Sequence, residues 1–170
     1  MSRTDQHVRI RQIAAWLPAL CIMIIIFSFS AREASDSSRT SSHLLDMLAC
    51  ISEHLFGVAI RHGTALYDTL HVIIRKLGHL SEYMALGFFL TLPLHMHGLR
   101  RFRLLLAGEA VSILYACSDE FHQLFVPGRD GNITDVAIDS LGALIGTGAA
   151  LLLLYLIQRK TRPEISQSRL

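Results

Sequence analysis

The stretch Ser118-Asp-Glu-Phe-His-Gln-Leu-Phe-Val-Pro-Gly-Arg-Asp-Gly-Asn-Ile-Thr-Asp-Val-Ala-Ile-Asp139 holds five acidic side chains, one His, one Gln and one Arg. Apolar runs flank it on both sides, Phe102–Cys117 before it and Leu141–Ile157 after it. Polar groups this dense, next to sequence apolar enough to cross a membrane, are costly to bury unless they pair with one another or carry a function. The stretch therefore indicates where a functional site would lie.

The composition of the whole chain indicates an integral membrane protein. Its 170 residues are 51% hydrophobic, the mean hydropathy is +0.40, and the apolar residues are grouped in blocks. The net charge of +2 does not suggest a nucleic-acid surface. Cys21, Cys50 and Cys117 lack metal-ligand spacing such as Cys-x-x-Cys, so we interpret them as buried structural thiols.

Four apolar blocks predict an all-α, polytopic bundle of four transmembrane helices. We expect the spans at about 13–30, 77–94, 102–119 and 136–157. The first block could instead be a cleaved signal peptide, because Ser28-Phe29-Ser30 imitates a small-x-small cleavage site. Its apolar part is long for such a peptide, so we expect an uncleaved span.

Between the first two spans, residues 31–76 predict an amphipathic, extracytoplasmic helical segment. Apolar residues recur there at helical spacing, at Leu44, Leu48, Ile51 and Leu55 and again at Leu66, Leu70, Ile73 and Leu77. Ser42 is a plausible N-cap of the first helix, and Gly63 is a plausible stop. The apolar faces would need lipid or the bundle to cover them.

The basic residues predict the orientation of the membrane domain, which spans 13–157. The N-terminal segment 1–12, the turn 95–103 and the tail 158–170 together hold ten of the sixteen Lys and Arg. The positive-inside rule places all three segments, and hence both termini, in the cytoplasm. The acidic stretch would then face the outside.

Four spans would deliver polar groups to one layer of the outer leaflet. With a helical rise of about 1.5 Å per residue, Ser28, His79, Asp119 and Asp139 all lie roughly 22–27 Å from the inner membrane face. This shared depth suggests that the spans close around a polar pocket. Gly142-x-x-x-Gly146, directly below the carboxylates, would permit close helix packing.

The candidate site residues come from this layer. Candidates for catalysis are His79, Glu82, Asp119 and His122. Candidates for binding are Lys76, Tyr83, Ser118, Glu120, Gln123, Arg129, Asp130, Asp135 and Asp139. A divalent cation is a candidate cofactor, with His79, Asp119 and Asp139 as its candidate ligands, since Asp and His are suitable ligand types.

Three interpretations of the layer remain open. It could be a buried network that fixes the bundle, at a modest ~0.6–2 kcal/mol for each polar group. It could bind a polar head group, with Arg129, Lys76 and Arg75 near the mouth. It could also be catalytic, with His79 or His122 as the base and the carboxylates holding a divalent ion.

At these residues the sequence resembles the VanZ-like family. The matching blocks are Arg75-Lys-Leu-Gly-His-Leu-Ser-Glu-Tyr-Met-Ala-Leu-Gly87, residues 118–131, Asp135 and Asp139-Ser-Leu-Gly142. Ser28-Phe-Ser30 is also similar to the family. The resemblance covers most of residues 13–157 and is weakest over 31–74. The family's namesake is linked to low-level resistance to teicoplanin, a glycopeptide that binds cell-wall precursors.

The resemblance implies a multi-pass protein of the bacterial plasma membrane with a role in the cell envelope. We expect it to bind a membrane lipid or lipid-linked envelope precursor in the outer leaflet, and modification of the bound molecule is the further activity that this implies. A small transporter or flippase and a non-catalytic assembly factor are the alternatives. No broken or repeated helices are visible in the sequence, which disfavours the transporter.

Overall fold

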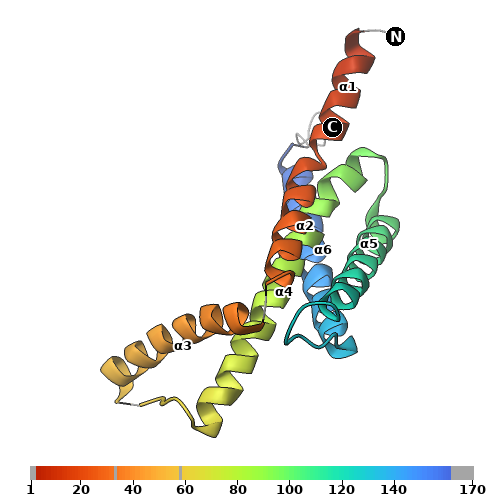
Figure 1. Cartoon of the computed structure of the whole chain (residues 1–170). Coiled ribbons are helices and arrows are strands. Elements are labelled where there is room, and N and C mark those ends of the chain that lie inside the picture. The colour runs from red at the N-terminus through yellow and green to blue at the C-terminus, as the bar shows by residue number, and fades with distance from the viewer. Residues whose placement is uncertain (1–2, 33, 58, 162–170) are drawn as a thin grey trace, which may run out of the picture.

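The computed structural model describes residues 3–32, 34–57 and 59–161, and within these ranges the regular structure is all helical. The helices are α1 (Arg3–Ala14), α2 (Leu17–Ser30), α3 (Ala34–Phe56), α4 (Ala65–Met96), α5 (Arg101–Gln123) and α6 (Ile133–Thr161). The predicted all-α class is confirmed. Figure 1 shows α2, α4, α5 and α6 gathered into a bundle, with α3 projecting from it.

The closest helix contact in the bundle joins α4 and α6. Gly142 and Gly146 of α6 face the backbone carbonyls of Leu80 and Met84, and a Cβ at either glycine would overlap those carbonyls. The glycines therefore let the two helix backbones touch, as the Gly142-x-x-x-Gly146 spacing predicted.

The same contact continues deeper into the bundle from the α4 side. Gly87 lies against the backbone of Ala143, where a Cβ would also overlap. The Thr147 hydroxyl donates a hydrogen bond to the Gly87 carbonyl at 3.2 Å. This contact fixes the register of α6 on α4, and hence the height of Asp139 relative to His79.

Helix α2 is attached to the rest of the bundle at several heights. The Tyr115 hydroxyl of α5 donates to the Met23 carbonyl at 2.6 Å. Near the other end of α2, the Trp16 ring nitrogen lies 3.3 Å from His97 Nε2. The buried core between the helices is formed by Ala19, Ile26, Tyr83, Leu86, Leu90, Leu94, Leu104, Ala116, Val136 and Ala143.

The connections between helices define two ends of the bundle. In Figure 1 the start of α2, the α4–α5 turn and the end of α6 lie at one end. The α2–α3 junction and the loop between α5 and α6 lie at the opposite end, near the middle of α4. In both views α3 and the first turns of α4 lead away from the bundle as an arm. We call this segment, Ala34 to about Ile74, the arm.

The segment predicted as an amphipathic insert has different boundaries in the structure. Helix α3 begins at Ala34, so Ser42 lies inside it rather than at its N-cap. It ends at Phe56, and the stop is Gly57, whose φ of 67° is the left-handed conformation typical of a residue that follows a helix. The predictions for Ser42 and Gly63 are therefore wrong, since α3 is longer at its start and shorter at its end.

The second amphipathic repeat is not a separate helix. Thr64 caps α4, because its hydroxyl oxygen accepts a hydrogen bond from the Tyr67 N–H at 3.2 Å. From there α4 runs without a break to Met96. No proline lies between Thr64 and Leu92, and Pro93 comes only in its last turn. One helix thus serves both the arm and the bundle.

Two stretches in the described part of the chain are both long and apolar enough to cross a membrane. They are Asp5–Ser30, which combines α1 and α2, and Ile133–Lys160 in α6. Helix α4 has 32 residues and α5 has 23, so both are long enough. Their polar side chains, such as His79, Glu82 and Glu109, make them less apolar. The four-span arrangement stays a prediction.

The interpretation of the cysteines as buried thiols is wrong. Cys21, Cys50 and Cys117 are free and exposed on the outer faces of α2, α3 and α5. Their helices bury other faces against the bundle, so these small apolar side chains are left at its periphery.

Candidate functional site

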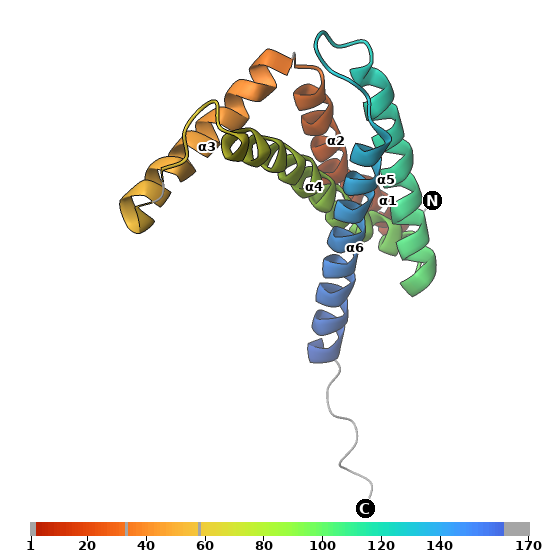
Figure 2. The ribbon, with the colours of Figure 1, turned by 90° about the horizontal axis from the view of Figure 1, so that it is seen from below.

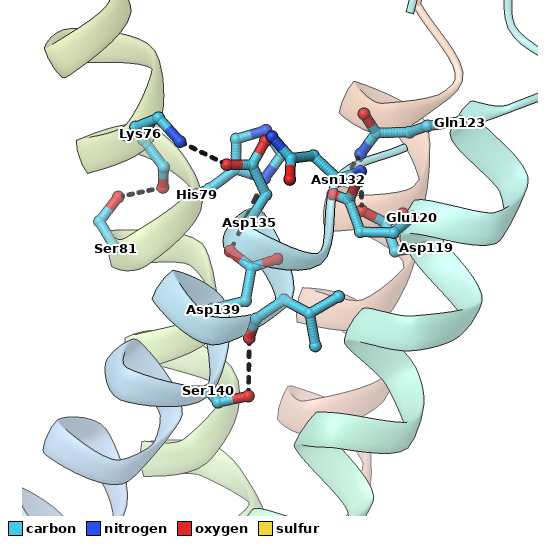
Figure 3. A network of polar contacts seen from close by, with 12 residues as sticks. Lys76, His79, Ser81, Asp119, Glu120, Gln123, Asn132, Asp135, Asp139 and Ser140 are labelled. Atoms are coloured by element: carbon cyan, nitrogen blue, oxygen red, sulfur yellow. Dashed lines mark hydrogen bonds and ion pairs between the residues drawn. The ribbon is translucent and has the colours of Figure 1, made fainter. Parts of the chain in front are cut away.

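The polar side chains of the predicted layer meet where the middle of α4 reaches the end of α5 and the start of α6. Figure 3 shows His79 of α4, Asp119 and Glu120 of α5, and Asp139 of α6 converging there. Asp119, Glu120 and Asp139 are buried, with 3%, 5% and 0% of their surfaces exposed. We call these four residues the acidic cluster.

Asp139 lies at the centre of the acidic cluster. Its Oδ1 lies 3.8 Å from Nδ1 of His79, which is too long for a hydrogen bond. Neither carboxylate oxygen of Asp139 has a hydrogen-bond partner, and neither does Nδ1 of His79. A buried carboxylate with no donor is costly, so its position suggests a functional role.

Glu120 is held in place by the loop that leads into α6. Its Oε2 accepts a hydrogen bond from the Asn132 N–H at 2.8 Å, and its Oε1 accepts one from Gln123 at 3.1 Å. Gln123 also donates to Oδ2 of Asp119 at 3.3 Å. Gly131 allows this close approach, because a Cβ there would overlap the Glu120 carbonyl.

Three of these groups are close enough together to bind one ion. Potential ligand atoms of His79, Glu120 and Asp139 all lie within 4.8 Å of one another. The sequence had suggested His79, Asp119 and Asp139 as ligands, and the structure places Glu120 in this group where Asp119 was expected. Asp119 is a neighbour of the group, and its Oδ1 is buried without a partner.

Lys76 and Asp135 form an ion pair beside the acidic cluster. Lys76 Nζ lies 2.5 Å from Oδ1 of Asp135, and Figure 3 shows the two side chains pointing toward each other between α4 and α6. Asp135 is one helical turn before Asp139. The charge of Lys76 is therefore already paired, and Asp139 receives no such partner.

A pocket of about 220 Å³ opens next to His79. Its walls come from the end of α2, from α3, from α4 and from the loop after α5. The lining residues are Phe29, Ser30, Arg32, Ser41, Leu44, Ile74, Arg75, Gly78, His79, Glu82 and Arg129. Three of these side chains are guanidinium groups, whereas the apolar side chains come from the arm and from the end of α2. The pocket could thus receive an anionic group joined to an apolar one.

Arg129 joins this pocket to the end of α2. Its Nε donates to the Arg32 carbonyl and its Nη2 to the Phe29 carbonyl, both at 3.1 Å, while Nη1 lies 3.4 Å from Oε1 of Gln123. Arginine near a helix C-terminus satisfies the last carbonyls and interacts favourably with the helix dipole. Burial lowers the pKa of Arg129, and the nearby charge of Arg75 lowers it further. An anion in the pocket would relieve this crowding of positive charge.

The remaining predicted site residues lie around the acidic cluster in different roles. Glu82 is half-buried and lines the pocket beside His79. Tyr83 is fully buried and packs beside Tyr115, and its hydroxyl has no partner. Ser118 is exposed and donates to the Tyr115 carbonyl, and Asp130 is exposed in the loop.

His122 does not join the acidic cluster. Its ring stacks on Phe27 of α2, with 4.7 Å between the ring centroids. The structure thus offers His79, and not His122, as the histidine beside the carboxylates. Sequence reasoning grouped them because His122 is three residues after Asp119, but the neighbouring Glu120 is the side chain that turns toward His79.

Several lining residues were missed by sequence reasoning. Ser30, Arg32, Ser41, Leu44 and Ile74 contribute to the pocket, but their sequence suggested only the end of the first span, a loop and an amphipathic insert. Two signals were available in this region: the family-like Ser28-Phe-Ser30, and the positive charge of Arg32 directly after the first apolar block.

These features define an all-helical protein that has two apolar helices of membrane-spanning length and a buried acidic cluster beside a guanidinium-lined pocket. The chain belongs to the VanZ/LLP1 family, whose model matches residues 15–156. Neither the curated proteins nor the solved structures include a significant match to this chain.

Proposed function

We propose that this protein is a four-span membrane protein that binds an amphiphilic molecule with an anionic head group from the outer leaflet. The main support for this proposal is the pocket. In it Arg32, Arg75 and Arg129 lie beside apolar side chains such as Leu44 and Ile74. Guanidinium groups suit a phosphate or carboxylate, because their donors form a planar fork. A membrane lipid or a lipid-linked envelope precursor has this chemistry.

The arrangement of basic residues supports the proposed orientation. The helix ends that carry the basic N-terminal segment, the 95–103 turn and the basic end of α6 lie together in Figure 1. By the positive-inside rule this end would be cytoplasmic, and the pocket would lie on the extracytoplasmic side. A lipid of the outer leaflet could reach it laterally, with its tail still in hydrocarbon.

A second candidate function is chemical modification of the bound molecule. It is favoured by His79 and Asp139, which lie close together while His79 Nδ1 and the Asp139 carboxylate lack hydrogen-bond partners. His79 lines the pocket and also faces the acidic cluster, so it would lie between the ligand and the carboxylates. A role in glycopeptide resistance would follow if the ligand is a cell-wall precursor. A flippase and an assembly factor remain alternatives, and the second predicts that cluster variants lose stability rather than binding.

Arg75 offers the sharpest test, because in the described part of the chain no hydrogen bond or ion pair engages its side chain. Arg75→Gln should weaken binding of a phosphate-bearing lipid about tenfold, since a hydrogen bond to a charged group contributes ~1.5–3 kcal/mol. Binding would be measured by native mass spectrometry of the detergent-solubilised chain with phosphatidylglycerol. Arg61→Gln, at an exposed arginine away from the pocket, is the matched control. Equal binding by both variants and the parent would refute the proposal.

A further inference from the structure

We propose that His79, Glu120 and Asp139 bind one divalent transition-metal cation of the Zn²⁺ or Mn²⁺ type. Its link to the ligand rests on the proposed function, because the cation would join the anionic head group to the acidic cluster. The binding of the metal itself stands on the geometry of the three side chains alone.

The spacing of the donor atoms fits a single small ion. One side chain comes from each of α4, α5 and α6, and their ligand atoms lie within 4.8 Å of one another. Two ligands at about 2.1 Å from a tetrahedral ion lie about 3.4 Å apart. His79 Nδ1 and Asp139 Oδ1, at 3.8 Å, need to move by only a fraction of an ångström.

The burial of Asp139 is the second, independent observation. This side chain is fully buried, both of its oxygens lack partners, and it points toward His79 (Figure 3). Two cationic side chains close to the site do not pair with Asp139, since Lys76 pairs with Asp135 and Arg129 donates to backbone carbonyls and to Gln123. A bound cation would supply the positive charge that the buried carboxylates lack.

The surroundings of Glu120 resemble the outer shell of a metal site. Carboxylates that bind metals are themselves held by hydrogen bonds, which fix their orientation. The Asn132 N–H and the Gln123 amide do this for Glu120, and each of its oxygens keeps lone pairs for an ion. The loop 128–132 thus positions one ligand.

The mixed donor set selects the class of metal. One imidazole with two carboxylates suits Zn²⁺ or Mn²⁺, whereas Mg²⁺ prefers oxygen ligands alone and keeps several waters. Three protein ligands leave a coordination position open. Because His79 also lines the pocket, an oxygen of an anionic head group could fill that position.

The test uses the full chain in detergent micelles, freed of metal by a chelator and then titrated with Zn²⁺ or Mn²⁺. Bound metal is counted by elemental mass spectrometry, and thermal unfolding is followed in parallel. We expect about one equivalent of metal in the parent and a higher Tm when metal is present. Asp139→Asn should weaken metal binding at least tenfold, whereas Asp68→Asn, at an exposed aspartate of α4, should bind as the parent does.

Two outcomes would overturn the metal site: a parent that retains neither metal and shows no change in Tm, or an Asp139→Asn variant that binds as well as the parent. If Asp139→Asn does not fold, Glu120→Gln takes its place, with Glu53→Gln as its exposed control. Phosphatidylglycerol binding is then measured with and without chelator. Lipid binding that is unaffected by chelation, in a chain without metal binding, would refute this inference and leave the proposed function standing.

Discussion

At the scale of the residue, Arg129 shows how one side chain can serve both structure and binding. Sequence reasoning placed it at the mouth of a pocket, and it does line the pocket. Its guanidinium, however, already donates to the Phe29 and Arg32 carbonyls and lies close to Gln123. It therefore ties the loop after α5 to the end of α2.

We predict that Arg129→Lys lowers the stability of the folded chain by about 1–3 kcal/mol. The lysine keeps the charge, but one ammonium group cannot reach all three oxygens, so carbonyls at the end of α2 would lose the charged donor that now binds them. The measurement is chemical or thermal unfolding in detergent, and Arg61→Lys is the exposed control. An unchanged stability for Arg129→Lys would show that its hydrogen bonds to α2 contribute little.

Individual side chains were also where prediction from sequence was least complete. Helical spacing placed Asp119, His122 and Gln123 on one face, but it could not tell which side of α5 faces α4. Glu120 and Asp119 both turn inward and His122 meets Phe27, because α5 packs between α2 and α6. Which residue faces inward depends on the rotation of a helix about its axis, and that is set by packing over the whole bundle.

At the scale of the element, the contact between α4 and α6 was predictable and the arm was not. The glycines Gly142 and Gly146 predict that α6 crosses a neighbouring helix closely, and the structure confirms this contact. The ends of α3 were misplaced because several Ser and Gly residues offered equally good caps. The local sequence therefore predicts a close helix contact at glycines better than it predicts where a helix begins or ends.

We predict that Gly146→Ala destabilises the bundle by about 1–3 kcal/mol, because the new methyl group overlaps the Met84 carbonyl and forces the helices apart. Gly148→Ala is the matched control in the same helix, since a Cβ there meets nothing within 4 Å. It should leave stability unchanged or raise it by up to ~1 kcal/mol through helix propensity. Thermal unfolding of both variants checks this, and equal effects would refute the close crossing.

At the scale of the whole molecule, the proposed orientation rests on where the charges gather. The basic segments lie at one end of the bundle, and the acidic cluster and pocket lie toward the other. The all-α class could be predicted from the apolar blocks of the sequence, and the shared layer of polar residues from their distances along the predicted spans. The pocket could not, because its walls come from the arm and from segments nearly 100 residues apart.

We predict that a cysteine at Asp130 is labelled by a membrane-impermeant maleimide in intact cells, whereas one at Gln6 is labelled only after permeabilisation. Both positions are exposed. The three native cysteines are exposed as well, so each must first be replaced by serine. Labelling at Gln6 from outside, with protection at Asp130, would reverse the proposed orientation.

Helix α4 is unbroken, and this continuity connects the arm to His79. Its 32 residues give a rod of about 48 Å, longer than the hydrocarbon core of about 30 Å. The arm includes the first turns of this helix, and no proline lies between those turns and His79. Because this helix is unbroken, we expect a displacement of the arm to shift the position of His79 as well.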